Sequence, residues 1–192
     1  MRKVDASEIL DLTSYEKIRA EFLEQTIALK RPRRISVGDA LCFLFENRDT
    51  VIFQIQEMTR VERTVSDGAI AAEVAVYNDL VPGDDELSAT LMIQIPDQAQ
   101  IRRQLDRLVG IDEHVFLDVG EATVQATFDE KQFEADRISA VQYIRFPLGP
   151  ELAAKFRDAS VPVELRVDHP NYAGKTPIDG EARASLSADL SG

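Results

Sequence analysis

Residues 47–65, NRDTVIFQIQEMTRVERTV, predict a helix that carries charged side chains on its apolar face. Asn47 is a favourable N-cap, and Asp49 falls in the first turn, where the helix dipole stabilises an acid. At about 100° per residue, apolar side chains recur on one stripe of this helix. The stripe consists of Val51, Ile55, Met58 and Val65.

Polar residues interrupt this stripe. Glu62 projects onto its centre, Arg48 lies close to it, and Gln54 lies at its edge. A buried carboxylate needs a charged or hydrogen-bonding partner, or else it becomes protonated. One interpretation is an ion pair that fixes how two helices pack. The other is a polar pocket lined by Glu62 and Gln54, with Arg48 at its mouth.

Helix and strand signals also follow one another on both sides of this segment. Capping patterns in residues 5–8 and 13–16 predict a short helical turn and a helix through about residue 29. A glycine-containing loop predicts a hairpin over residues 34–45. The later segments are predicted helices at 69–77, from 97 and after 150, and predicted strands at 88–95, 114–119, 122–128, 140–146 and 161–167.

This order predicts an α+β fold, because the strands and helices do not alternate as they do in βαβ proteins. We expect a single domain over residues 1–192, with a largely antiparallel sheet and helices packed mainly on one face. Residues 5–82 are predicted to be mostly helical with one hairpin, residues 87–170 to be strand-rich, and residues 179–192 to form a weakly helical tail.

The charge balance argues against several classes of partner. The net charge of −12 is unlike the basic excess of nucleic-acid-binding domains, and it opposes adsorption to an anionic membrane. No apolar run is long enough to span a membrane. The single cysteine, Cys42, predicts a reducing cytoplasm. One basic cluster, KRPRR at residues 30–34, is interpreted as a solvated helix end, with anion binding as the alternative.

Familiar catalytic and metal-binding motifs are absent from the sequence. It contains no GxGxxG, GxxxxGK[ST], GxSxG, HExxH or CxxC pattern. One Cys and two His cannot build a Cys/His zinc site within one chain. Glu57, Glu62 and Glu73 leave a carboxylate-rich iron or manganese site open, but no Glu-x-x-His pair supports it. We therefore predict no metal and no cofactor.

Three further residues are candidate ligand contacts. Tyr77 and Asn78 begin the turn-like segment YNDLVP, in which Asn ordinarily serves to end a helix. His169 follows a predicted strand beside Asp168, where a histidine can act as a general base or a metal ligand. The alternative is an exposed histidine in a loop. The candidate ligand-binding residues are thus Arg48, Gln54, Glu62, Tyr77, Asn78 and His169.

Several segments together resemble the DUF3501 family of uncharacterised bacterial proteins. The strongest is FLFENRDTVIFQIQEMTRVER at residues 43–63. Further matching segments are YNDLVP at 77–82, ATLMI at 89–93, LVGI at 108–111, SAVQYIRF at 139–146 and VDHPNY at 167–172. The resemblance covers nearly the whole chain. It implies a bacterial context near rubrerythrin-like and iron–sulfur proteins, and it assigns no catalytic residue.

Two hypotheses about function follow. The first is a non-enzymatic accessory protein that serves an iron–sulfur or rubrerythrin-type partner in a redox or peroxide-stress system. An acidic surface would then steer a basic partner. The second is a small-molecule-binding protein or an enzyme with a polar pocket around Glu62, Gln54 and Arg48. A homodimer formed through a strand edge is also compatible with the sequence.

Overall fold

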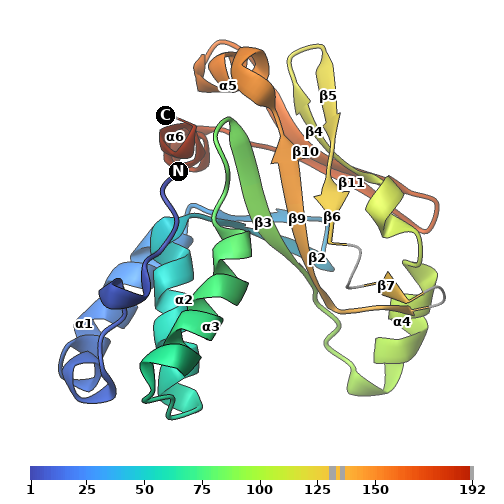
Figure 1. The fold of residues 1–192 in the computed structure, drawn as a ribbon. Helices are drawn as coiled ribbons and strands as arrows, with labels where there is room; N and C mark the ends of the chain where they lie inside the picture. The colour runs from blue at the N-terminus through green and yellow to red at the C-terminus, as the bar shows by residue number, and fades with distance from the viewer. Residues whose placement is uncertain (130–132, 135–136, 191–192) are drawn as a thin grey trace.

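Two antiparallel β-sheets that share one hydrophobic core form the body of the protein (Figure 1). The computed structural model describes residues 1–129, 133–134 and 137–190. The first sheet has the order β1-β2-β3-β9-β6, and the second has the order β11-β10-β4-β5. Their strands are β1 (Arg34–Val37), β2 (Leu41–Glu46), β3 (Glu86–Ile93), β4 (Val115–Val119), β5 (Ala122–Gln125), β6 (Thr127–Phe128), β9 (Val141–Pro147), β10 (Val163–His169) and β11 (Tyr172–Pro177). A separate two-stranded ladder joins β7 (Phe133–Glu134) and β8 (Arg137–Ile138).

Helices cover one side and both ends of this β-structure. Helices α1, α2 and α3 lie beside the first sheet, α5 and α6 lie near one end of the strands, and α4 lies at the opposite end (Figure 1). The predicted α+β class is confirmed. The helical elements are η1 (Ala6–Glu8), α1 (Leu12–Lys30), α2 (Arg48–Val61), α3 (Asp67–Tyr77), η2 (Asn78–Leu80), η3 (Gln98–Gln100), α4 (Ile101–Arg107), η4 (Ile111–Glu113), α5 (Gly149–Arg157) and α6 (Gly180–Asp189). Among the described residues, no helix combines the length and the apolar character needed to cross a bilayer.

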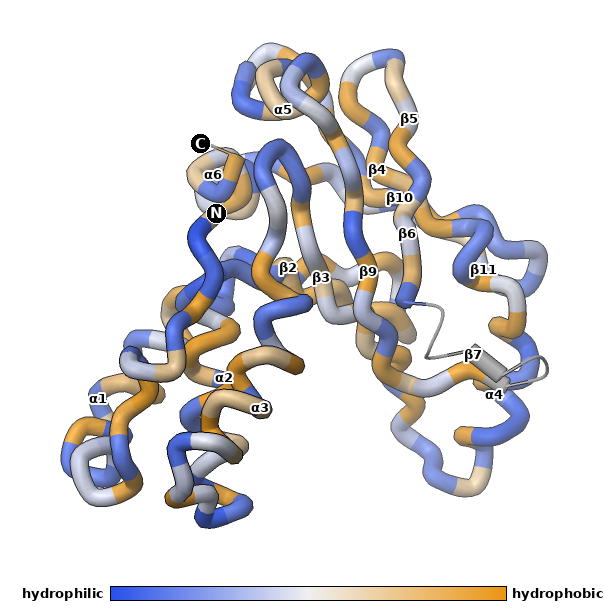
Figure 2. Tube along the Cα trace, viewed as in Figure 1, coloured by the Kyte–Doolittle hydropathy of each residue, from blue (hydrophilic) through white to orange (hydrophobic). Residues whose placement is uncertain are grey.

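Strand β2 is buried on both faces, which explains its nearly continuous apolar sequence. Phe43 and Phe45 belong to the core between the sheets and are fully buried. Successive side chains on a strand point to opposite faces, so Cys42 and Leu44 point toward the helices instead, where they are also buried. Figure 2 shows hydrophobic residues recurring along the strands of both sheets.

The two sheets meet at both of their edges. On one side, β5 and β6 are consecutive, and the backbone N–H of Ala126 between them donates to Val115 O at 2.9 Å. On the other side, Thr176 Oγ1 of β11 donates to Ser36 O of β1 at 2.6 Å. Exposed strand edges invite unwanted pairing, and these contacts cover part of the β1 edge.

Helix α2 ends four residues earlier than the sequence predicts. Arg63 has a left-handed backbone with φ of 54°, and Thr64 N donates back to Thr59 O at 2.9 Å. Such a left-handed residue terminates a helix even though it is not a glycine. Val65, predicted to belong to the apolar stripe, is 77% exposed beyond the end of the helix.

A buried guanidinium connects the segment before β1 and the end of β2 with the C-terminal helix α6. Arg33 is 1% exposed, so its interpretation as part of a solvated cluster is wrong. Its Nε donates to Phe45 O at 2.8 Å, and its Nη1 donates to Ser185 Oγ at 3.1 Å. Its Nη2 donates to the carboxylate of Asp189 and to Glu46 O. Burial raises the pKa of the Asp189 carboxyl, although the hydrogen bond from Arg33 opposes this shift.

A second network holds α1 against α2. The Glu57 carboxylate on α2 accepts bonds from Arg19 Nε at 2.8 Å and from the Tyr15 hydroxyl at 2.8 Å, both on α1. Arg60 donates to the same carboxylate at 3.2 Å. These donors, above all Arg19, lower the pKa of Glu57 to about 2. Burial of Tyr15, together with its bond to Glu57, raises the pKa of the Tyr15 hydroxyl.

We expect Arg33→Gln to lower the free energy of unfolding by about 3–5 kcal/mol, because it leaves the buried Asp189 carboxyl without its cation. Urea denaturation measures this change. Arg34→Gln is the matched control, since the neighbouring Arg34 is exposed and should change stability by less than about 0.5 kcal/mol. Equal effects of the two substitutions would contradict the role assigned to Arg33.

The lowered pKa of Glu57 predicts a loss of stability in acid. The carboxylate stabilises the fold fully above its ordinary pKa of 4.5, and this contribution disappears as the pH falls toward about 2. We expect Glu57→Gln to remove roughly 1–3 kcal/mol at pH 7, and the difference from wild type to shrink between pH 5 and pH 2. Denaturant unfolding across this pH range measures it, with the exposed Glu62→Gln as control.

Candidate functional site

The predicted pocket around Glu62, Gln54 and Arg48 is not formed. Arg48 is the first residue of α2 and Glu62 is its C-cap, so about 21 Å of helical rise separates them. Arg48 and Glu62 project from a similar side of α2, but they lie at opposite ends of the helix axis. Glu62 is exposed, which contradicts its predicted place in the centre of the buried stripe.

Arg48 and Gln54 have other surroundings. Arg48 donates to the carboxylate of Glu8 and thereby joins η1 to α2, and this bond is the largest cause of the lowered pKa of Glu8. Gln54 is half-buried, whereas Gln56 is the amide that α2 buries completely. Gln56 Nε2 donates to Leu10 O at 2.9 Å, and its Oε1 accepts from Leu10 N at 2.9 Å.

Asn78 and Tyr77 lie at the end of α3. Asn78 Oδ1 accepts from Val4 N at 2.8 Å and its Nδ2 donates to Val4 O at 2.9 Å, so its side chain fixes the N-terminal segment. Tyr77 lines a cavity of about 620 Å³ beside Tyr143 and Arg145. Arg145 is already bonded there to Glu86 and to Asp79 O.

His169 is a buried strand residue and not an exposed loop residue. It is 5% exposed, and both ring nitrogens have partners. Asn171 N donates to Nδ1 at 3.2 Å, so Nδ1 is the acceptor and Nε2 donates to Val109 O at 3.0 Å. Asp168, predicted to assist His169, lies instead 3.0 Å from Nδ1 of His114. No general base is assembled from the pair of Asp168 and His169.

The structure therefore does not bring the six predicted residues together. Tyr77 lines one of the cavities described here, and the other five line none of them. Within residues 1–129, 133–134 and 137–190, no group of three or more His, Cys, Asp and Glu side chains is placed to hold a metal ion.

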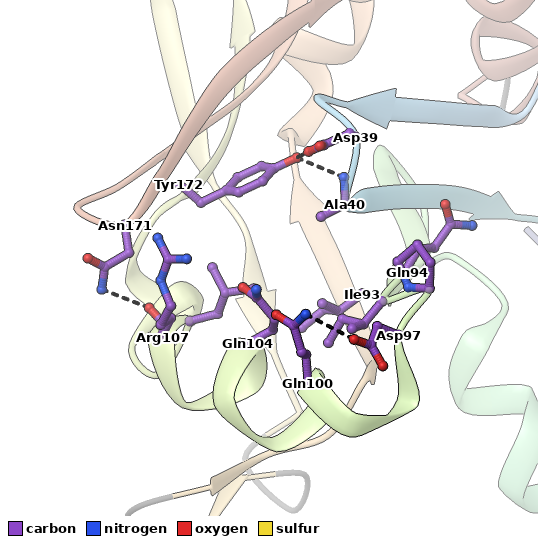
Figure 3. Close-up of a pocket in the computed structure, with 13 residues that line it drawn as sticks. Asp39, Ala40, Ile93, Gln94, Asp97, Gln100, Gln104, Arg107, Asn171 and Tyr172 are labelled. Carbon is purple, nitrogen blue, oxygen red and sulfur yellow. Dashed lines mark hydrogen bonds between the residues drawn. The ribbon is translucent and has the colours of Figure 1, made fainter.

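A different cavity is lined by polar side chains from two parts of the fold. It has a volume of about 560 Å³ and lies between α4, the start of β2, the end of β3 and the β10–β11 turn (Figure 3). We name it the α4 groove. Its lining residues are Asp39, Ala40, Ile93, Gln94, Ile95, Pro96, Asp97, Gln100, Gln104, Arg107, Leu108, Asn171 and Tyr172.

Local capping builds one wall of the α4 groove. The Asp97 carboxylate accepts from Ala99 N and from Gln100 Nε2, both at 2.9 Å, and so starts the helical turn that leads into α4. Gln100, Gln104 and Arg107 follow at a spacing of four and then three residues, which places them on one helical face. That face lines the groove.

Tyr172 holds the opposite wall in place. Its hydroxyl donates to Val37 O at 2.7 Å and accepts from Ala40 N at 3.0 Å. Gly38 makes this approach possible: its φ is 62°, and a Cβ at this position would clash with the Tyr172 hydroxyl. The Asp39 carboxylate also lies within 3.4 Å of that hydroxyl.

The groove offers hydrogen-bonding groups that are free to meet a ligand. The side chains of Gln94, Gln104 and Arg107 make no hydrogen bond or ion pair to any residue that the structure describes. Amide and guanidinium groups recognise polar ligands without a change of protonation state at neutral pH. The arrangement is suited to non-covalent binding.

The family model "Protein of unknown function (DUF3501)" matches residues 3–190. The chain belongs to the DUF3501 family. A crystal structure at 1.90 Å of a novel protein of unknown function from Burkholderia pseudomallei K96243 is similar to it, with 38% sequence identity and a TM-score of 0.92. The match covers 98% of this chain and 100% of the Burkholderia chain. No curated protein matches the sequence.

The sequence patterns do not predict the α4 groove of this DUF3501 protein. The polar spacing of Gln100, Gln104 and Arg107 is visible in the sequence, as is the capping by Asp97. The second wall was not predicted, because β11 has an alternating, half-exposed pattern with little apolar content. Strand β11 pairs with β10 through His169 and Tyr172, and Pro170 and Asn171 form the turn between them.

We expect Tyr172→Phe to destabilise the DUF3501 protein by roughly 1–3 kcal/mol, because Val37 O and Ala40 N both lose a partner. Tyr77→Phe is the control, since the Tyr77 hydroxyl makes no hydrogen bond to the described residues. Thermal and urea unfolding of both variants measure the difference. If Tyr172→Phe is as harmless as Tyr77→Phe, the hydroxyl does not anchor this wall.

Proposed function

We propose that this DUF3501 protein is a non-enzymatic accessory protein that binds an iron–sulfur or rubrerythrin-type redox partner in the cytoplasm. The distribution of charge carries the proposal. Residues 83–192 contain 20 of the 34 acidic residues but only 11 of the 22 basic residues. The acidic excess thus falls mainly on the strand-rich half, and such a field speeds association with a basic partner.

One end of the β-structure combines this charge with a concave surface. Glu121 in the β4–β5 turn and Glu181 in α6 are exposed, and neither forms an ion pair with a described residue. A cavity of about 640 Å³ lies at this end, lined by α6 and by the residues that flank β10. We propose this end as the face that meets the partner.

The α4 groove favours a second candidate function, which is small-molecule binding. Its volume of about 560 Å³ lies within the usual range of about 300–1,000 Å³ for ligand pockets. It replaces the predicted pocket around Glu62, Gln54 and Arg48. The free side chains of Gln94, Gln104 and Arg107 support this candidate.

Isolation of the tagged protein from its own host, after mild cross-linking, tests the accessory role. We expect enrichment of an iron–sulfur or rubrerythrin-type protein with stoichiometric iron, and cross-links to residues 83–192. Lack of any such protein among the enriched species, or cross-links confined to α1–α3, would contradict the proposal.

Charge variants then test the docking face. Glu121→Gln with Glu181→Gln should slow association with the captured partner several-fold at low salt and have little effect at high salt. The control is Glu24→Gln with Glu62→Gln, which changes the net charge equally at exposed positions on α1 and at the end of α2. Equal slowing by both pairs would indicate a general charge effect and no specific face.

A further inference from the structure

We propose that the α4 groove binds a short zwitterionic peptide of about three residues, with its carboxylate at Arg107 and its amine at Asp97. This inference goes beyond the accessory role and does not depend on it. It rests on three properties of the groove: opposite charges at its two ends, the distance between them, and neutral amides along its length.

The charges of the groove are separated by sign. Figure 3 shows Arg107 at one end of the α4 side and Asp97 toward the other, with Gln104 and Gln100 between them, whereas Asp39 lies on the facing wall beside the Tyr172 hydroxyl. The Arg107 guanidinium is exposed and unpaired among the described residues, so it is free to bind a carboxylate as a two-pronged donor. A ligand with a single charge would satisfy only one end.

The length of α4 sets the distance between these ends. Ten residues separate Asp97 from Arg107, which corresponds to about 15 Å of helical rise, and the long Arg107 side chain, which on a helix leans toward the N-terminus, covers part of this distance. An extended chain spans at most about 3.3–3.6 Å per residue, so three residues reach about 10 Å. A single amino acid is too short to contact both ends at once.

The middle of the groove suits peptide groups. The free amides of Gln94 and Gln104 each offer a donor and an acceptor, which are the groups that a peptide backbone needs. Ile93 and Leu108 supply apolar surface in the lining. Asp97 retains acceptor capacity for an ammonium group, because each carboxylate oxygen has further lone pairs beyond the bonds from Ala99 and Gln100.

NMR titration of the ¹⁵N-labelled protein with trialanine tests the proposal. We expect saturable shifts confined to residues of the groove, including Gln104 and Tyr172. N-acetyl-trialanine and trialanine amide, which each lack one terminal charge, should bind about three- to tenfold more weakly. Equal affinity for all three peptides, shifts outside the groove, or no saturable shift would each overturn the proposal.

Variants identify which end binds which charge. Arg107→Gln should weaken trialanine to the level of trialanine amide and remove the difference between these two peptides. Asp97→Asn retains capping ability and should remove the difference between trialanine and its N-acetyl form. Arg103→Gln, an exposed charge on the same helix that does not line the groove, is the control.

Capture of an iron-containing partner with no peptide response would leave the accessory role intact and refute this inference. A specific response to trialanine without capture of an iron-containing partner would support this inference and contradict the accessory role. A response to acetate equal to that for trialanine would indicate an anion site at Arg107 alone, and it would refute the zwitterion.

Discussion

The buried guanidinium of Arg33 is the contact on which the placement of helix α6 against the β-structure depends. It bonds to main-chain oxygens at the end of β2 and to the Asp189 carboxylate of α6, which lies 156 residues away in sequence. Both side chains are nearly removed from water, so the loss of either one would leave the other charge buried without its counter-ion. The bond therefore fixes α6 on the β-structure at the point where the chain turns from β2 into α2.

The position of α6 also determines how one end of the core is covered. Helix α6 and α5 cover one end of the core, and Arg183 of α6 stacks on Phe156 and donates to carbonyl oxygens at the end of α5. At the opposite end, α4 has seven residues and packs near β8 of the small β7–β8 ladder. A seven-residue helix fills less of that end, and a groove lined by polar side chains remains beside it.

Local patterns predicted most of the elements, whereas contacts between distant residues escaped prediction. The capping box of Asp5 and Glu8 and the β1–β2 hairpin depend on residues close in sequence, and both are present. The end of α2 depends on a left-handed Arg63, for which no glycine gives a signal. Arg33 resembles its exposed neighbours in composition, and only its distant partner, Asp189, shows that it is buried. Glu62 was misplaced because angular periodicity says nothing about where a helix stops.

The α4 groove likewise has one wall built by local contacts and one wall built by contacts between residues that are distant in the sequence. Its first wall is local, because Asp97 caps the turn from which Gln100, Gln104 and Arg107 project. Its second wall requires the β10–β11 hairpin to reach the β1–β2 turn, where the Tyr172 hydroxyl bridges Val37 and Ala40. Neither wall encloses the groove alone, so the groove exists only once both sheets have assembled. A groove of this kind leaves no compact motif in the sequence, which is consistent with the absence of familiar catalytic signatures in a chain that nevertheless folds a polar groove.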